Sequence, residues 1–264
     1  MSPDFLFWLS LIVKMAVTAG FVLTATIVAE RAGPLLAGLI ATLPISAGPV
    51  YVFLALDHDA RFIADAALGS LVINPVTAVY ALSYAVLAQR YSLAVSFSAA
   101  FALWLALALI FQSVPWTFAT TLLLNLAAFP VCLWTARPLR HVPIPRVRGY
   151  WYDVVLRAAS VALLVATVVA LSFRIGPAGT GVLAVFPVVL TSIIIILHRR
   201  VGGPATAAVL ANTILGLVGF GCALATLHLA ALPLGPPLAL PLALAVSVGW
   251  SLLVLLARKR GIAV

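Results

Sequence analysis

The sequence predicts an all-α protein, a polytopic transmembrane helical bundle. Of its 264 residues, 65% are hydrophobic and 8% are charged, whereas soluble domains contain roughly 45–50% apolar and about 25% charged residues. The mean hydropathy of +1.24 agrees with this assignment. Because a soluble fold cannot bury so much apolar surface, we expect a lipid bilayer to surround a single membrane domain over residues 1–264.

Apolar runs long enough to cross a bilayer, about 20 residues each, occur about nine times along the chain. The N-terminal run lacks the basic region and cleavage site of a removable signal peptide, so we count it as a true span. The predicted spans are residues 5–29, 34–56, 62–87, 91–111, 115–136, 153–173, 177–197, 204–230 and 236–257.

The basic residues give these spans an orientation. If the N-terminus lies outside, the outer loops contain only Arg61 and Arg174, and the cytoplasmic side collects eleven basic residues. The positive-inside rule describes this asymmetry, so we expect an outside N-terminus and a cytoplasmic C-terminus. Because topology explains most of the net charge of +9, we do not expect nucleic acid as a partner. The cytoplasmic residues are Arg31, Arg90, Arg137, Arg140, Arg146, Arg148, Arg199, Arg200, Arg258, Lys259 and Arg260.

Two stretches of the chain match when the sequence is shifted by 143 residues. Residues 13–45 then fall on 156–188 without gaps and with ten identical positions. Both stretches contain the pattern R-x-G-P-x3-G-x2-A-x2-P, which ends at Pro44 in the first and at Pro187 in the second. The sequence therefore contains an internal repeat, the feature that most directly indicates a duplicated architecture.

We extend this match to two repeats of four spans each, residues 1–112 and 153–264. Residues 113–152 then form a linking span followed by a basic cytoplasmic loop. A single linking span turns the second repeat over relative to the first, which gives the inverted topology common in secondary transporters. Duplication without transport is the alternative.

Pro44 and Pro187 lie inside their predicted spans, where each removes a backbone hydrogen bond. Ser46, Gly48 and Pro49 follow Pro44 closely, so the chain contains several helix-weakening residues there. The sequence leaves open whether each proline breaks its helix or only kinks it. Since broken helices at mid-membrane indicate transporter sites, these five residues are candidate substrate-binding residues.

Polar residues inside other spans extend this candidate site. Lys14 lies well inside the first span, and Arg157 falls on the equivalent position of the second repeat. A basic residue at this depth costs roughly 2.5–3.5 kcal/mol on insertion scales, which points to an anionic ligand or to an acidic partner such as Glu30 or Asp65. Close helix packing is the alternative explanation for the polar residues that complete the set. These are Asn74, Thr191 and Asn212.

The sequence contains none of the motifs for phosphate loops, zinc proteases, nucleophile elbows or dinucleotide binding. We therefore expect no enzyme activity, no metal and no cofactor. The prediction is a secondary-transporter-like protein that moves a small solute, with an anion as the candidate ligand. The alternative is a non-transporting inner-membrane accessory protein for envelope or polysaccharide biogenesis, acting as a homodimer or with an envelope partner protein.

One short pattern resembles a known family. Ala37-Gly38-Leu39 followed by Leu43-Pro44, and Gly181-Val182-Leu183 followed by Phe186-Pro187, are similar to GlpM-type small multi-span membrane proteins, which are associated with alginate production. The resemblance implies a fused, inverted pair of such proteins in the bacterial inner (plasma) membrane, linked to envelope or polysaccharide biology. It implies no catalytic residues.

Overall fold

The computed structural model describes residues 3–31, 46–140, 142 and 150–260, and their regular structure is helical, as predicted. Pro44 and the first part of the second predicted span lie outside the described residues. The α-helices are α1 (Pro3–Arg31), α3 (Ala47–Asp57), α4 (Ala60–Leu87), α5 (Leu93–Gln112), α6 (Phe118–Ala136), α7 (Trp151–Ala184), α8 (Val188–Leu234) and α9 (Pro236–Lys259), with a 3-10 helix at Arg137–Leu139.

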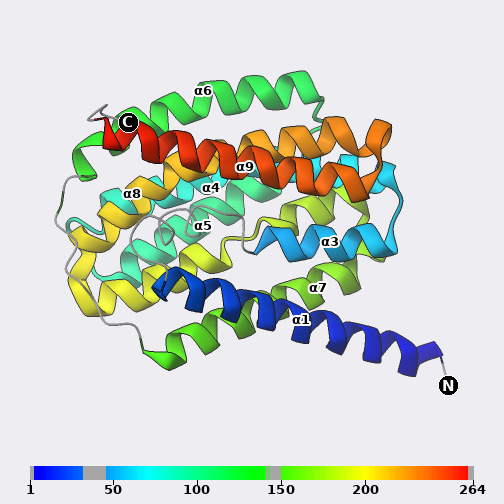
Figure 1. Ribbon diagram of the computed structural model, residues 1–264. Helices are drawn as coiled ribbons and strands as arrows, with labels where there is room; N and C mark the ends of the chain where they lie inside the picture. The colour runs from blue at the N-terminus through cyan, green and yellow to red at the C-terminus, as the bar shows by residue number, and fades with distance from the viewer. Residues whose placement is uncertain (1–2, 32–45, 141, 143–149, 261–264) are drawn as a thin grey trace.

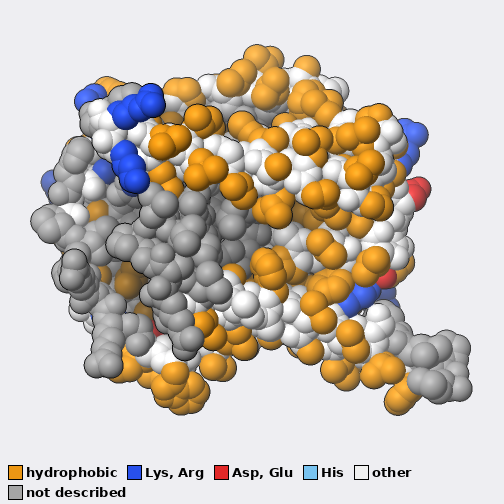
Figure 2. All heavy atoms as spheres, in the orientation of Figure 1, with side chains coloured by type: hydrophobic (Ala, Val, Ile, Leu, Met, Phe, Trp, Pro, Cys, Tyr) orange, Lys and Arg blue, Asp and Glu red, His pale blue; other side chains and the backbone are white. Residues whose placement is uncertain are grey.

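Six helical stretches in the described part of the chain are long and apolar enough to cross a membrane. One of them, Trp151–Leu234, joins α7 and α8 over 84 residues, several times the length of about 20 residues that one crossing needs. Apolar side chains cover most of the flank shown in Figure 2, and Lys and Arg side chains gather near its two ends. The chain is a multi-span helical membrane protein.

Glycines with positive φ turn the chain back on itself. Gly176 lies within α7 at φ 71°, Gly202 within α8 at φ 81°, and Gly235 between α8 and α9 at φ 75°. Glycine reaches this backbone region without the steric cost that a Cβ adds. The ion pair between Asp153, at the start of α7, and Arg200 places the segments on either side of Gly176 side by side. The long helical stretch is therefore folded into antiparallel segments, which Figure 1 shows as the green-to-yellow part of the chain.

Helix α4 lies at the centre of the bundle. Of its residues, 78% are buried, against 22% in the apolar windows of α5 and α9. The Asn74 side chain donates to the Leu217 carbonyl at 3.0 Å, and His228 Nδ1 lies 2.8 Å from the Ala64 carbonyl oxygen. Because the contact partner in α8 moves toward higher numbers as the partner in α4 moves toward lower ones, the two helices run antiparallel.

Small residues let helices approach α4 closely, as the sequence predicts for the stripe of small residues. A Cβ added to Gly181 would lie 2.1 Å from the Ala66 carbonyl oxygen, and one added to Gly69 would lie 2.7 Å from the Ala178 carbonyl oxygen. Neither glycine belongs to the predicted stripe, of which Thr180 is fully buried. The closest approach therefore falls one residue away from the predicted face.

Pro75 interrupts the hydrogen bonding of α4 without breaking the helix. Proline has no N–H, so the carbonyl of Leu71, four residues earlier, loses its donor within the helix. The Asn125 side chain of α6 replaces that donor at 3.0 Å. Inside a membrane a freed carbonyl must find a partner within the protein or in water, and this contact attaches α6 to the central helix.

Candidate functional site

The chain is non-helical at residues 185–187, between the end of α7 at Ala184 and the start of α8 at Val188. Pro187 explains the interruption, because proline lacks an N–H and disfavours helical backbone in the residue before it. Helical hydrogen bonding resumes only where the Thr191 N–H donates to the Pro187 carbonyl at 2.9 Å. At Pro187 the helix is therefore broken, which answers the question that the sequence leaves open.

Hydroxyl groups lie beside both sides of this interruption. On the α7 side, the Ser70 hydroxyl donates to the Gly181 carbonyl at 2.7 Å, and the Tyr51 hydroxyl lies 2.6 Å from Ser70 Oγ. On the α8 side, the Tyr80 hydroxyl lies 3.0 Å from Thr191 Oγ1. These contacts provide partners for polar groups that an unbroken apolar helix would not need.

The polar groups continue along α4 toward its C-terminal end. The Tyr84 hydroxyl lies 2.6 Å from Nδ1 of His198, and both Tyr80 and Tyr84 are fully buried. Two tyrosines one turn apart on α4 thus face a hydroxyl and an imidazole on the first part of α8. The arrangement is a column of hydrogen-bonding groups inside an apolar bundle.

Aromatic rings border the interruption on the α5 side. The Phe186 ring packs edge-on against Trp104 and Phe101, with centroid distances of 5.2 and 5.9 Å. The Trp104 indole donates to the Thr77 hydroxyl at 3.3 Å, so the tryptophan has a polar partner where it is buried. Residue 186 is thus anchored between α5 and the site.

Two ion pairs lie near opposite ends of α4. Lys14 Nζ is 2.5 Å from Asp57 Oδ2, and Asp57 comes just before α4. Arg200 and Asp153 approach within 2.7 Å, close to Gly203, where a Cβ would lie 2.1 Å from the Ala88 carbonyl oxygen at the end of α4. A helix of 28 residues is about 42 Å long, so the two pairs lie at opposite ends of the bundle.

The Arg200 pair has two hydrogen bonds and an aromatic neighbour. Nη1 is 2.7 Å from Asp153 Oδ2, and Nη2 is 2.7 Å from Asp153 Oδ1. The guanidinium carbon also lies 4.6 Å from the centroid of the Tyr150 ring, within the range of a cation–π contact. This bidentate geometry is the strong form of an arginine–carboxylate contact.

The acidic partner of Lys14 is Asp57 rather than Asp65, one of the two candidates taken from the sequence; the side chain of the other, Glu30, lies outside the described structure. Asp57 is 43 residues from Lys14 along the chain. The pair neutralises the lysine, so an anionic ligand is not needed to explain a basic residue within α1.

His58, which follows Asp57 between α3 and α4, is held by Ser172 and by aromatic rings. Its Nε2 lies 2.8 Å from the Ser172 hydroxyl, and its ring stacks on Phe62 at 3.7 Å. Burial lowers the pKa of His58 from its usual value of 6.5, against the opposing effects of Asp57 and Asp59. We therefore expect a neutral imidazole at pH 7.

The structure brings some of the predicted site residues together. Pro187 and Thr191 lie at the interruption, and Asn74 lies one turn beyond Ser70 on α4. Asn74 is fully buried and spans from α4 to α8 through the Leu217 carbonyl, in agreement with the packing alternative rather than with a ligand site.

Other predicted residues lie apart from the interruption. Gly48 and Pro49, in the first turn of α3, line a separate cavity, and Ser46 precedes that helix. Asn212 accepts a hydrogen bond from Arg258 at 3.0 Å, far along α8. Arg157 lies on α7, and Pro44 lies outside the described residues.

Several residues of the site are absent from the prediction. Tyr51, Ser70, Tyr80 and Tyr84 supply most of its hydrogen-bonding groups. One signal could have identified part of this set: Ser70, Thr77 and Tyr84 recur at intervals of seven residues on α4, a spacing that places polar groups on one face of an apolar helix.

In the described part of the chain, no group of three or more His, Cys, Asp or Glu residues is placed to hold a metal ion. Comparison with known proteins gives no matching family model, no similar curated protein and no similar solved structure. The similarity to GlpM-type proteins therefore stays a prediction.

Proposed function

We propose that the protein is a secondary-transporter-like membrane protein that moves a small polar solute past the interruption at residues 185–187. The observation that carries this proposal is the broken helix, whose two ends face hydroxyl groups of α3, α4 and α8. Half-helix ends expose unpaired carbonyls and N–H groups, and transporters use such ends to bind ions and solutes near mid-membrane. Hydroxyl donors suit an anion, which stays our candidate solute.

The proposed architecture is nine spans, arranged as two inverted four-helix repeats with α6 as the linking helix. A residue that contacts its own repeat equivalent lies at the axis that relates the two copies. Asn74 and Leu217 are hydrogen-bonded to each other and are separated by 143 residues, the same shift that aligns the two sequence stretches. This coincidence supports an axis between α4 and the second part of α8.

The two ion pairs support the same relation. Asp57 and Arg200 are also 143 residues apart, and each pairs with the first helix of its own half, through Lys14 and Asp153 respectively. Their charges are opposite. In an inverted pair the two positions face opposite sides of the membrane, so the positive-inside rule favours the acidic residue outside and the arginine in the cytoplasm.

Solute passage then requires the site to open to each side in turn. We infer that each ion pair holds the first helix of its repeat against the following half-helix at one membrane face, and that opening of that face separates the pair. The orientation expected in a bacterial inner membrane is an outside N-terminus, with the Lys14 pair outside and the Arg200 pair inside.

Access to Thr191 tests the proposal without knowledge of the solute. We replace Cys132 and Cys222 with alanine, introduce Thr191→Cys, and treat oriented vesicles with a charged, membrane-impermeant thiol reagent from either side. Alternating access predicts labelling from both sides. Arg61→Cys and Arg90→Cys report the two faces, and we expect labelling from outside only and from inside only. Leu123→Cys, on the lipid-facing side of α6 at 65% exposure, is the unlabelled control.

Labelling of Thr191→Cys from one side only, or from neither, would contradict transport and favour the non-transporting accessory function. Labelling of Arg61→Cys and Arg90→Cys from the same side would contradict the nine-span arrangement instead. The two arms therefore separate failure of the mechanism from failure of the topology.

A further inference from the structure

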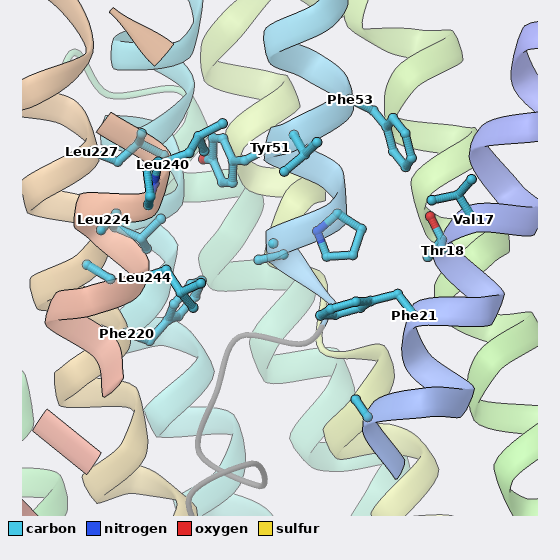
Figure 3. A pocket seen from close by; sticks show the side chains of 18 residues that line it. Val17, Thr18, Phe21, Tyr51, Phe53, Phe220, Leu224, Leu227, Leu240 and Leu244 are labelled. Atoms are coloured by element: carbon cyan, nitrogen blue, oxygen red, sulfur yellow. The ribbon is translucent and has the colours of Figure 1, made fainter. Parts of the chain in front are cut away.

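A cavity of about 640 Å³ lies between α1, α3, α8 and α9. In Figure 3, α3 lies between α1 on one side and α8 and α9 on the other, and labelled side chains from all four helices surround the space. The volume falls within the roughly 300–1,000 Å³ typical of small-ligand sites. Tyr51 lines this cavity, while its hydroxyl group contacts Ser70 beside the interruption.

The cavity offers few polar groups to a ligand. Among its described lining residues, Thr18 and Tyr51 carry the polar side chains. The Thr18 hydroxyl donates to the Lys14 carbonyl at 2.8 Å, and the Tyr51 hydroxyl lies 2.6 Å from Ser70 Oγ. A hydrophilic solute would lose its hydration here without replacement hydrogen bonds, whereas a hydrocarbon chain loses nothing by entering.

The proposed repeat explains why this space is open. In the other half of the chain, four aromatic residues occupy the corresponding region: Tyr80, Tyr84, Phe97 and Phe101. Their equivalents, 143 residues later, are smaller and all line the cavity: Ala223, Leu227, Leu240 and Leu244. The sequence thus replaces four rings with aliphatic side chains around one cavity.

Charges lie near one end of the cavity. Thr18 is one turn from Lys14 on α1, so the cavity wall continues toward the ion pair of Lys14 with Asp57. An apolar space that ends near a pair of charges matches a molecule with a hydrocarbon tail and a polar head. The cavity lies among helices of membrane-spanning length, where such molecules form the surrounding solvent.

We propose that this cavity binds the hydrocarbon tail of an amphipathic lipid, with the head group at the level of Lys14 and Asp57. The acyl chain of a phospholipid and the isoprenoid chain of a lipid carrier share this chemistry. The comparison of residue sizes uses the repeat relation of the proposed function, but the binding of a tail does not require transport.

Photolabelling tests this inference. The purified full-length protein is reconstituted with a palmitate analogue that carries a diazirine in mid-chain, and the labelled residues are mapped by mass spectrometry. We expect labels at Phe220 and Leu224 inside the cavity. Ala223→Tyr with Leu244→Phe, which restores the ring-bearing residues of the other half, should reduce these labels more than tenfold, since each lost methylene contact lowers affinity about fourfold. Leu123→Phe, on the lipid-facing side, should leave them unchanged.

Competition on the unaltered protein gives a second test if the filled variant does not fold. Excess unlabelled palmitate should suppress the cavity labels, and butyrate at the same concentration should not. Native mass spectrometry of the purified protein then distinguishes a retained phospholipid from an isoprenoid lipid.

The inference is overturned if neither the filled variant nor palmitate changes the labels at Phe220 and Leu224. It is also overturned if proximity cross-links show that another segment of the chain, or a second copy, fills the cavity. Neither result bears on the labelling of Thr191→Cys, so failure of the lipid site and failure of transport are distinguishable.

Discussion

Lys14 and Asp57 join α1 to the end of α3 through an ion pair in which Nζ and Oδ2 lie 2.5 Å apart. The two side chains are only 11% and 21% exposed. Taking one partner away leaves the other charge in a poorly solvated place, which is the costly way to disrupt a buried pair. The pair therefore makes a clear prediction about stability.

Lys14→Ala should destabilise the protein by about 3 kcal/mol, the lower end of the range for an orphaned buried charge. Lys14→Ala with Asp57→Ala should cost less than the sum of the two single changes, because no unpaired charge remains. Thermal unfolding in detergent micelles measures all three variants, and Arg90→Ala, at an exposed loop position, is the control. Additive losses would show that the two residues are not coupled.

Asn125→Ala should leave the Leu71 carbonyl without a donor and cost about 1–3 kcal/mol, the penalty for an unsatisfied buried polar group. Pro75→Ala returns a backbone N–H to that carbonyl. We therefore expect Asn125→Ala to cost less in the Pro75→Ala background than in the unaltered protein. The measurement is a double-mutant cycle of unfolding free energies, and equal costs in both backgrounds would disprove the proposed role of Asn125.

Gly219→Ala and Gly249→Ala form a matched pair of changes. A Cβ on Gly219 would lie 2.3 Å from Cδ1 of Trp250, whereas one on Gly249 would meet nothing within 4 Å. Gly219→Ala should displace the indole that donates to the Leu215 carbonyl and cost about 1–3 kcal/mol. Gly249→Ala should be neutral or stabilise by roughly 0.5–1 kcal/mol through helix propensity. Melting temperatures in one detergent provide the comparison, which fails if both changes act alike.

His58 should make stability depend on pH. Its pKa in the folded protein is lowered from 6.5 by burial, so the unfolded chain binds more protons than the folded one between the two pKa values. Stability therefore falls as the pH drops below about 6.5 and continues to fall until the folded pKa is passed. His58→Gln keeps a hydrogen-bonding side chain near Ser172 without this titration. Its melting temperature should decrease less between pH 7.5 and 5, and an unchanged profile would assign the dependence to other groups.

The sequence alone predicts the class of the fold and several of its interruptions. Composition and run length identify membrane helices, since about 20 apolar residues in a row suit a bilayer. The ranges 62–87 and 236–257 agree with α4 and α9 within two residues. Pro187 could be named as a helix-weakening residue because its effect is local, depending on a missing N–H and a fixed ring.

Tertiary structure decided which residues meet. Asp57 reaches Lys14 over 43 residues, and Tyr80 reaches Thr191 over 111 residues. In a soluble helix, the apolar face shows which side is buried. Here the lipid-facing and the buried sides are both apolar, so periodicity does not show that α4 is central. Only the packing of the helices places the α4 hydroxyl groups beside the break at Pro187 and leaves a cavity beside α3.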